Sequence, residues 1–478
     1  MMMKRVVLLL SLSLPLMAGL KNLTLHQALQ MVKHDNLEVK IARFSEQMQQ
    51  TEVKVAEGMN YGSLDISLSA MRSNDALNVF GFKLMDREAT FADFGFSDFM
   101  GAIGQGAAQS GGDFGKFTQG LAQNGDAILK IAPNDLNYPD ARNNYQTKLS
   151  YMLPLYTGGK LTEYKHIMES MYRMSKYDTQ KIISTKIYEV KKAFYDISLV
   201  ERYIYNLSKI MKNIKKLENV TLSMQKEGYA KEMDLLEVQA REAEAASMYN
   251  QAKLNRDLAY QFLSFLLNKE VSSIKKVHAK APMPHVDKQI LESNNIDIQK
   301  AKLGLQISEM SVKVQESSFL PTIGGFAEYG SADNTLFNDF TGKDSYTFGV
   351  QAKWNIFNGG QDDAKLEKAK LKRLQVRDQL ELAKRGIALH AKKLKTEILS
   401  ADADIRSYTK QLKFAKRVYD NYSTRYEEGM ASISDVLIQQ SKELESLLKL
   451  LTVVNKRNTK IFELESIINT GGDVLKNL

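Results

Sequence analysis

The spacing of hydrophobic positions predicts two very long helices. In residues 360–428 apolar side chains recur at alternating steps of four and three, the pattern of a coiled-coil seam. The seam comprises Ile387, Ala391, Leu394, Ile398, Ala401, Ile405, Tyr408, Leu412, Ala415, Tyr419, Tyr422 and Tyr426. In residues 159–227 hydrophobic side chains recur every seventh residue from Ile183 to Met211, and neither Pro nor Gly occurs between Lys160 and Glu227. A helix of about 67 residues is about 100 Å long, more than a globular domain needs.

Shorter helical patterns precede and follow these two. They cover about 24–57, 231–268, 287–317 and 433–468. Thr24 and Gln27 have the spacing of a capping box at the start of the first pattern. Ser432 or Ser434 is the expected cap of the last.

Alternating patterns predict four strands, two in each half of the chain. Residues 345–357 place Tyr346, Phe348 and Val350 on one face and polar residues on the other, and 145–153 and 63–69 alternate in the same way. A weaker pattern occupies 321–331. Strands of this length suit an outer membrane when they are tilted. A soluble sheet with one face packed on helices is the alternative.

The chain also matches itself at two offsets. At an offset of 259, Asn36 aligns with Asn295 and Val53-Lys54-Val55 aligns with Val312-Lys313-Val314. At 201, the pairs are Gly158-Gly159 with Gly359-Gly360, Gly228 with Gly429, Ala230 with Ala431, and Asp234 with Asp435. We therefore predict a twofold repeat, with a first half at 19–285 and a second at 286–470. The offset falls because the first half has extra residues within 73–142.

Four strands cannot close a barrel, and open strand edges in lipid leave backbone groups without hydrogen bonds. A membrane sheet of this kind would therefore have to be shared by several copies of the chain. Two, three or four copies would give 8, 12 or 16 strands.

The two ends of the chain lie outside the repeat. Lys4 and Arg5 precede an apolar run that ends in small residues at Ala18-Gly19, so 1–18 is predicted to be a secretory signal peptide. Residues 471–478 form a short tail. The chain has no Cys, which excludes disulfides and a Cys nucleophile.

Composition excludes several classes of function. After the first 20 residues no apolar run approaches the ~20 residues of a membrane-spanning helix. The six His show no metal-ligand spacing, and no P-loop, G-x-S-x-G or H-E-x-x-H occurs, so we predict no enzyme, metal or cofactor. The net charge of +9 is spread over the helices among acidic residues, and no basic patch carries interleaved aromatic residues. Nucleic acid is therefore not an expected partner.

The order of elements and several short motifs resemble the TolC-like outer-membrane efflux and secretion channels. The motifs are Leu23-Thr24-Leu25-His26-Gln27-Ala28-Leu29, Asn78-Val79-Phe80-Gly81-Phe82-Lys83-Leu84, Leu155-Tyr156-Thr157-Gly158-Gly159, Ile356-Phe357-Asn358-Gly359-Gly360 and Tyr426-Glu427-Glu428-Gly429 with Asp435. The resemblance implies a mainly α protein with membrane β: a homotrimer whose 12-stranded barrel, four strands per chain, lies in outer-membrane lipid. That barrel would continue into a long periplasmic α-helical barrel. It implies a passive duct served by a periplasmic adaptor and an inner-membrane transporter.

The same resemblance suggests a gate at the periplasmic tip, where Gly228 and Gly429 end the long helices. Asp234, Asp435 and Glu237 would form acidic rings, which disfavour anions and favour cations. Tyr426 matches a family Tyr that holds neighbouring hairpins shut. The family's basic partner is replaced by Ala431, so Arg425 or Lys231 is the candidate substitute. Asp234 and Asp435 are also suited simply to cap the return helices.

The remaining candidate positions lie at the tip turns and at the sheet. Tyr229 and Met430, beside the turn glycines, are the expected adaptor contacts. Gly158, Gly159, Gly359 and Gly360 allow the strand-to-helix turns. Tyr151, Tyr156, Trp354 and Phe357 would form an aromatic belt at the membrane interface, or would only pack the sheet.

The stretch 73–142 would be a long extracellular loop between the first two strands, rich in Phe and Gly. We expect it to pack on the barrel rim; the alternatives are a loop that folds over the mouth or contacts other molecules, and a disordered spacer. The other reading of the whole chain is a periplasmic coiled-coil scaffold or adaptor without channel activity. The sequence does not separate drug efflux, metal efflux and protein secretion.

Overall fold

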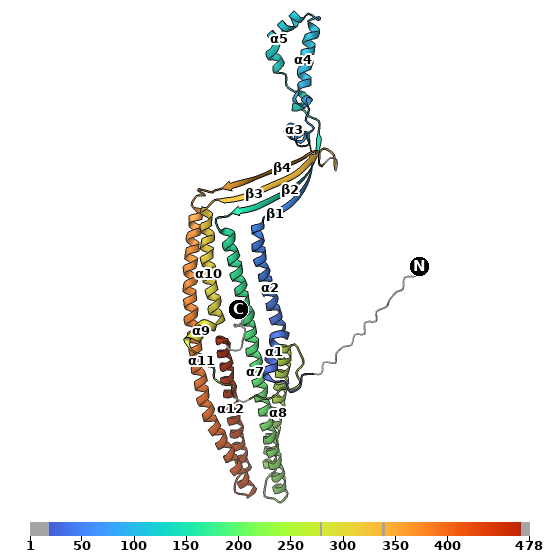
Figure 1. Cartoon of the computed structure of the whole chain (residues 1–478). Coiled ribbons are helices and arrows are strands. Elements are labelled where there is room, and N and C mark those ends of the chain that lie inside the picture. The colour runs from blue at the N-terminus through green and yellow to red at the C-terminus, as the bar shows by residue number, and fades with distance from the viewer. Residues whose placement is uncertain (1–18, 278–279, 337–339, 470–478) are drawn as a thin grey trace, which may run out of the picture. The chain divides into compact units, whose positions relative to one another are not determined.

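The computed structural model describes residues 19–277, 280–336 and 340–469, so the predicted signal peptide and the 471–478 tail lie outside the described residues. The described chain is mostly helical and contains one four-stranded antiparallel sheet (Figure 1). It divides into two compact units. The helical unit comprises the described residues of Met1–Glu52, Ile167–Glu309 and Lys370–Leu478. The sheet unit comprises those of Val53–His166 and Met310–Ala369.

Two helical hairpins of equal length make up most of the helical unit. Their long arms are α7 (Lys160–Lys226) and α11 (Gln361–Glu427), of 67 residues each. Their short arms are α8 (Glu232–Leu267) and α12 (Ile433–Ile468), of 36 residues each. Every bound in the second hairpin follows its counterpart in the first by 201 residues, from Lys160 and Gln361 to Leu267 and Ile468.

Each hairpin is joined to a broken helix through one asparagine. The first broken helix is α1 (Leu25–Asp35) and α2 (Leu37–Gly58), and the second is α9 (Lys288–Asn294) and α10 (Ile296–Glu316). Asn36 donates from Nδ2 to Leu266 O (2.8 Å) and accepts the Val39 N–H. Asn295 donates to Ile467 O (2.9 Å) and accepts the Ile298 N–H. The same side chain thus starts the second helical segment and fixes it to the end of the short arm in both halves.

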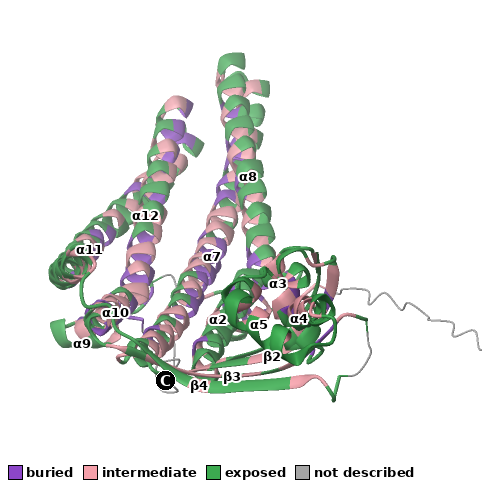
Figure 2. Ribbon diagram, turned by 90° about the horizontal axis from the view of Figure 1, so that it is seen from above, coloured by how far each residue is buried: buried purple, intermediate pink, exposed green. Residues whose placement is uncertain are grey.

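The core of the helical unit lies along the predicted coiled-coil seam. Leu394, Ile398 and Ile405 of α11 are buried against α12 and α7, and Phe194 and Ile197 of α7 are buried against α8 and α1. Figure 2 shows the buried residues as stripes along the facing sides of the helices. The predicted capping box of Thr24 and Gln27 is confirmed, and Ser432 is the N-cap of α12. Among the described residues, we find no helix with an apolar stretch long enough to cross a membrane.

The sheet follows the chain order β1-β2-β3-β4, and every neighbouring pair is antiparallel. Its strands are β1 (Ser63–Ser73), β2 (Arg142–Tyr156), β3 (Thr322–Asp333) and β4 (Asp344–Lys353). The last strand ends at Lys353, four residues before the end of the alternating pattern. Its partner β3 begins at Thr322, and the preceding Pro321 has no N–H with which to extend the ladder. Trp354 and Phe357 therefore lie beyond the strand.

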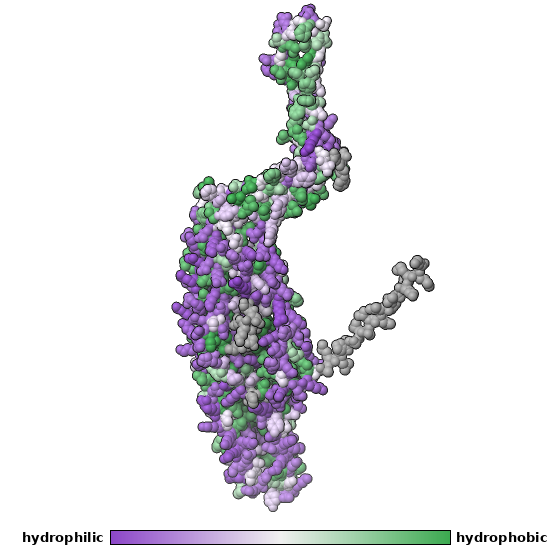
Figure 3. Space-filling model, in the orientation of Figure 1, coloured by the Kyte–Doolittle hydropathy of each residue, from purple (hydrophilic) through white to green (hydrophobic). Residues whose placement is uncertain are grey.

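One face of this sheet is apolar and exposed across all four strands. The cross-strand pairs Leu64↔Tyr151, Ile66↔Leu149 and Tyr329↔Tyr346 place their side chains on the same face. Leu64, Ile66, Leu68, Tyr346, Phe348 and Val350 are each at least 64% exposed. The opposite face carries serines, Gln146 and the ion pair between Lys148 and Glu328, 2.8 Å apart. Hydrophobic residues also gather on the sheet in Figure 3.

The connection between β1 and β2, predicted as a loop, contains four helices. They are α3 (Ala76–Met85), α4 (Phe96–Gln109), α5 (Phe114–Leu129) and the single turn α6 (Asn134–Asn137). We call residues 74–141 the insertion. Sequence reasoning missed its helices because glycine lowers helix propensity by about 1 kcal/mol per residue. Caps such as Asp75 and Asp113 nevertheless start α3 and α5.

Candidate functional site at the hairpin turns

Both hairpins reverse at a glycine in the left-handed conformation. Gly228 has φ +85° and Gly429 has φ +74°. In each turn a later N–H returns to the long arm: Tyr229 N to Met224 O and Met430 N to Arg425 O, both 2.8 Å. No atom lies within 4 Å of a Cβ built on either glycine, so backbone conformation alone favours Gly there. The turns leave Tyr229 and Met430 exposed, at 79% and 59%.

The two aspartates after these turns take part in capping. Asp435 Oδ2 accepts from Ser432 Oγ (2.6 Å) and from the Ser432 N–H, while the Asp435 N–H donates to Ser432 Oγ. Asp234 Oδ2 accepts from the Lys231 N–H (2.8 Å). Each carboxylate therefore stabilises the first turn of a short arm, where the helix dipole favours negative charge. This is the second of the two roles that the sequence suggested, and it leaves the gating role a prediction.

Tyr426 joins the two hairpins inside the helical unit. Its ring is 5% exposed, and its hydroxyl lies 2.9 Å from Thr221 Oγ1 of α7. An apolar cluster that includes Ile214, Val238 and Val436 surrounds this bond. Burial raises the pKa of Tyr426, and the negative charge of Asp234 acts in the same direction, whereas the hydrogen bond between Tyr426 and Thr221 lowers it.

Three polar contacts link the hairpins around this cluster. Lys216 Nζ of α7 pairs with Glu427 Oε1 of α11 (2.8 Å), and Ser434 Oγ of α12 donates to Glu237 Oε2 of α8 (2.7 Å). Arg241 Nη2 reaches Leu437 O at 3.5 Å. With the Thr221–Tyr426 bond, these contacts form what we call the tip latch.

The candidate substitutes for the missing basic residue do not link the hairpins. Arg425 donates to Met430 O (3.5 Å) in its own turn and lies over the Tyr422 ring. Lys231 donates through its backbone N–H to Asp234. At the tip, Lys216 and Arg241 are the cations seen to cross between the hairpins, and sequence reasoning missed both because neither carries a motif. Thr221 could have been found, since it continues the seam of Ile210, Ile214 and Leu217 with a polar side chain.

The other predicted positions lie in the sheet unit. Gly158, Gly159, Gly359 and Gly360 have φ of +64°, +86°, +74° and +77° and form the two strand-to-helix turns. A Cβ on Gly158 would lie 2.9 Å from Ser317 O. Of the predicted interface aromatics, Tyr151 OH donates to Tyr61 O (2.8 Å) and Trp354 Nε1 donates to Phe319 O (3.1 Å). Tyr156 and Phe357 are exposed, at 42% and 82%.

A second buried tyrosine makes the tip sensitive to alkali. Burial, with the charge of Glu443 second, raises the pKa of Tyr419 from 10 to about 12. The folded state therefore favours the neutral phenol. The contribution of neutral Tyr419 to the free energy of unfolding is complete below pH 10 and is lost as pH rises through 12. Two pKa units correspond to at most about 2.7 kcal/mol. We expect urea unfolding followed by circular dichroism to show lower stability at pH 11.5 than at pH 9, and Tyr419→Phe to reduce that difference. An equal loss in Tyr419→Phe would contradict this assignment.

Within the described part of the chain, no group of three or more His, Cys, Asp or Glu side chains is placed to hold a metal ion. The tip is a packing contact between the two hairpins. It consists of an apolar cluster, a buried pair of hydroxyl groups and exposed polar contacts.

Residues 288–470 match the family described as outer membrane efflux protein. The chain carries an outer membrane efflux protein domain. The solvent efflux pump outer membrane protein SrpC of Pseudomonas putida is 30% identical over 192 residues, which are 38% of this chain and 37% of SrpC. The match to this relative thus spans less than half of its length.

Solved outer-membrane channels share the fold over nearly the whole chain. CusC superimposes with a TM-score of 0.73 at 14% identity, over 93% of this chain and 91% of CusC. The CmeC outer membrane channel of Campylobacter jejuni superimposes with a TM-score of 0.70 at 17% identity, over 95% of this chain and 88% of CmeC. The efflux protein domain therefore belongs to a chain with the TolC-like channel fold, which confirms the resemblance seen in the sequence.

Proposed function

We propose that this chain is the outer-membrane exit duct of a tripartite efflux or type I secretion system. Three copies would share a 12-stranded barrel in outer-membrane lipid and a long periplasmic α-helical barrel, each copy contributing two structurally repeated halves. The observation that carries the proposal is the apolar face of the sheet, exposed on all four strands of a single copy. Channel fold and efflux domain support it.

The sheet of one copy is incomplete in two ways. β1 and β4 each have one neighbour, so each offers a row of unpaired backbone groups at a sheet edge. Its apolar face is also uncovered. No described residue of the sheet unit shields Ile66 or Phe348 from water. Pairing of β4 with β1 of the next copy would satisfy the edges, and lipid would cover the apolar face.

The helical unit has exposed apolar residues suited to the same assembly. On α11 they are Leu371, Leu382, Leu389 and Leu399, and on α2 and α8 they are Leu37, Ile41, Phe44, Met48, Leu254, Leu258 and Phe265. Figures 1 and 2 place α11 on one side of this unit and α8 on the other. Contact between α11 of one copy and α2 and α8 of the next would bury both sets, as hydrophobic burial favours.

The tip latch is suited to hold the periplasmic end closed. Opening requires the hairpins to separate, which breaks the Thr221–Tyr426 bond and exposes the cluster around it. Rings of Asp234, Asp435 and Glu237 would line the opening and favour cations. The exposed Tyr229 and Met430 would contact a periplasmic adaptor, which couples the duct to an inner-membrane transporter. Names of relatives such as SrpC refer to solvent efflux, but the cargo class of this chain is left open.

Planar-bilayer recording of the purified protein tests the proposal. We expect detergent extraction to yield a trimer that forms ion-conducting, cation-selective channels. A water-soluble monomer that forms no channels would overturn the proposed duct function and favour the alternative of a periplasmic scaffold.

Two variants separate the charge of Asp435 from its capping role. Asp435→Asn keeps an acceptor for Ser432 but removes three charges from a trimer, so we expect reduced cation selectivity with unchanged conductance. Ser432→Ala removes the capping hydroxyl and keeps the charge, so selectivity should be unchanged while stability falls by about 1 kcal/mol. Unchanged selectivity in Asp435→Asn would remove Asp435 from the gate.

Tyr426→Phe tests the latch. It removes the bond between Tyr426 and Thr221, while Thr221 Oγ1 keeps its hydrogen bond to Leu217 O (2.9 Å). The loss costs about 0.5 to 1.5 kcal/mol and should increase the fraction of time that the channel is open. Tyr229→Phe, at an exposed turn position, is the matched control. Equal open probability in the two variants would exclude the Thr221–Tyr426 bond from gating.

A further inference from the structure

The α4–α5 hairpin of the insertion has no buried core of its own. None of the residues in either helix is buried. Phe96 and Met100 of α4 are 50% and 48% exposed, and Phe114 and Leu129 of α5 are 77% and 75% exposed. Figure 3 shows hydrophobic residues over this hairpin. Two helices with no buried core are marginal in water, because burial of an apolar face supplies most helical stability.

Glycines inside these helices are not explained by the fold of one copy. Gly101, Gly104 and Gly106 of α4 and Gly120 and Gly125 of α5 are outside the left-handed region. A Cβ on any of them would have no atom within 4 Å, so contact between α4 and α5 does not require them. Each costs about 1 kcal/mol relative to Ala inside a helix. Close approach of another backbone is what would favour Gly at such positions.

The hairpin surface has almost no charge. Residues 96–129 contain only Asp98, Asp113, Lys116 and Asp126 as charged residues, whereas 25% of the whole chain is charged. A solvated helix normally has a charged outer face. Identical surfaces of this kind can meet without the repulsion that like charges would cause, which favours a second copy of the hairpin as the partner.

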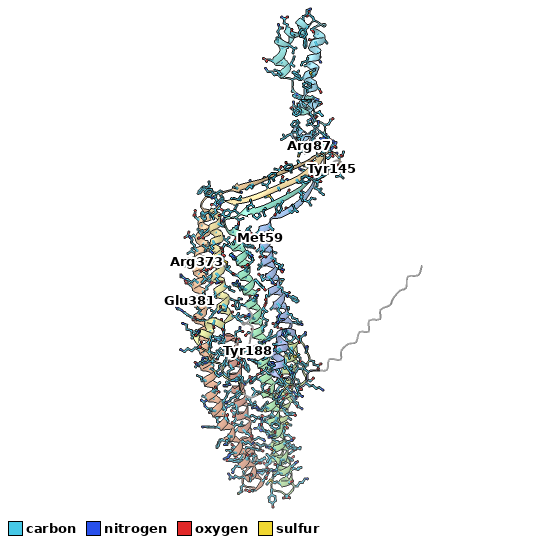
Figure 4. All side chains as sticks on the ribbon, viewed as in Figure 1. Met59, Arg87, Tyr145, Tyr188, Arg373 and Glu381 are labelled. Atoms are coloured by element: carbon cyan, nitrogen blue, oxygen red, sulfur yellow. The ribbon has the colours of Figure 1, made fainter. Side chains whose placement is uncertain are left out.

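The base of the insertion is held against the sheet. Arg142 at the start of β2 pairs with Asp86 and Glu88, and Lys343, just before β4, pairs with Glu88 (2.6 Å) and Asp333 (3.0 Å). Arg87 donates to Asp344 O, and Figure 4 shows Arg87 beside Tyr145 at this end of the sheet. Both strand connections therefore start from the same sheet end, opposite the strand ends that join the long helices.

We propose that the α4–α5 hairpins of the three copies pack on one another at the rim of the barrel. This inference rests on the proposed trimer, because closure of three sheets into one barrel would fix three hairpin bases around one rim. The local concentration of hairpins would then be in the millimolar range, typical of short tethers. The partner is the same hairpin of a neighbouring copy, and the contact surface is its exposed apolar and glycine positions.

Cysteine crosslinking tests this directly, because the chain contains no Cys. Ala108→Cys on α4 and Ala122→Cys on α5, both at exposed positions, are introduced together as a reporter. The full chain is treated with a short bismaleimide at low protein concentration in detergent. We expect covalent dimers and trimers on a denaturing gel. Native mass of the same sample is measured in parallel.

One further pair of substitutions and a single control substitution locate the contact. Adding Gly101→Leu and Gly104→Leu to the reporter should abolish the covalent products while the native trimer mass is unchanged. Gly81→Leu, in α3 where nothing lies within 4 Å of a built Cβ, is the matched control and should leave them unchanged. A native trimer without covalent products, or with products insensitive to the leucines, overturns the inference and indicates hairpins that face water, lipid or another protein. Absence of the trimer itself would instead overturn the proposed function.

Discussion

In the proposed outer-membrane trimer, Phe348→Arg is expected to abolish assembly, whereas Thr347→Arg is tolerated. Phe348 lies on the apolar face of β4 and is 76% exposed in one copy. Arginine on the lipid face of a barrel costs about 2 to 4 kcal/mol near the bilayer centre, and a trimer would contain three of them. We therefore expect the heat-resistant trimer in isolated outer membranes to fall by about tenfold or more, as measured on unheated gels.

The neighbouring residue makes a close control. Thr347 is on the opposite face and pairs across strands with Glu328. Thr347→Arg therefore places the same charged side chain in the same strand as Phe348→Arg, but on the face that does not contact lipid. Ile66→Arg on β1 should reproduce the defect of Phe348→Arg. Equal trimer levels in Phe348→Arg and Thr347→Arg would show that the apolar face does not meet lipid.

Arg142→Met is expected to release the base of the insertion from the sheet. The Asp86 side chain is fully buried, and Arg142 is its ion-pair partner in the structure. Removal of one member of a buried pair costs about 3 to 5 kcal/mol, because the remaining charge has no partner. We expect limited proteolysis within residues 74–141 to become about a hundredfold faster, which corresponds to about 3 kcal/mol of local opening.

Two variants show whether the buried charge is the cause. Arg142→Met with Asp86→Asn removes both charges and should recover much of the protease resistance. Arg256→Met removes a partly exposed cation that pairs with the adjacent Asp257, so it should change stability by less than about 1 kcal/mol. If Arg142→Met digests at the wild-type rate, the ion pairs do not hold the insertion.

Local patterns in the chain were enough to predict the long helices, the strands and the glycine turns. The seam from Ala391 to Tyr426 and the alternation around Phe348 are periodic over many residues, and periodicity reflects which face of an element is buried. Gly228 and Gly429 could be placed because a left-handed turn favours a residue without Cβ. The efflux domain and channel fold confirm the family resemblance that these elements carried.

The helices of the insertion and the end of β4 were not predicted. Glycine-rich α4 and α5 lack the propensity and the buried face by which helices are recognised in a sequence. The alternating pattern continues to Phe357, but the ladder stops at Lys353 because a strand needs a partner with N–H groups to extend it.

By itself, the sequence determined the long helices, the strands, the glycine turns and the order in which they occur, since each depends on residues within a few turns or a few strand positions. The tertiary structure decided which side chains meet: Tyr426 with Thr221, 205 residues away, Glu427 with Lys216, 211 residues away, and Arg142 with Asp86, 56 residues away. Such pairs carry no local signal, because the attraction between two side chains acts only once packing of the helices and strands has brought them within a few ångströms.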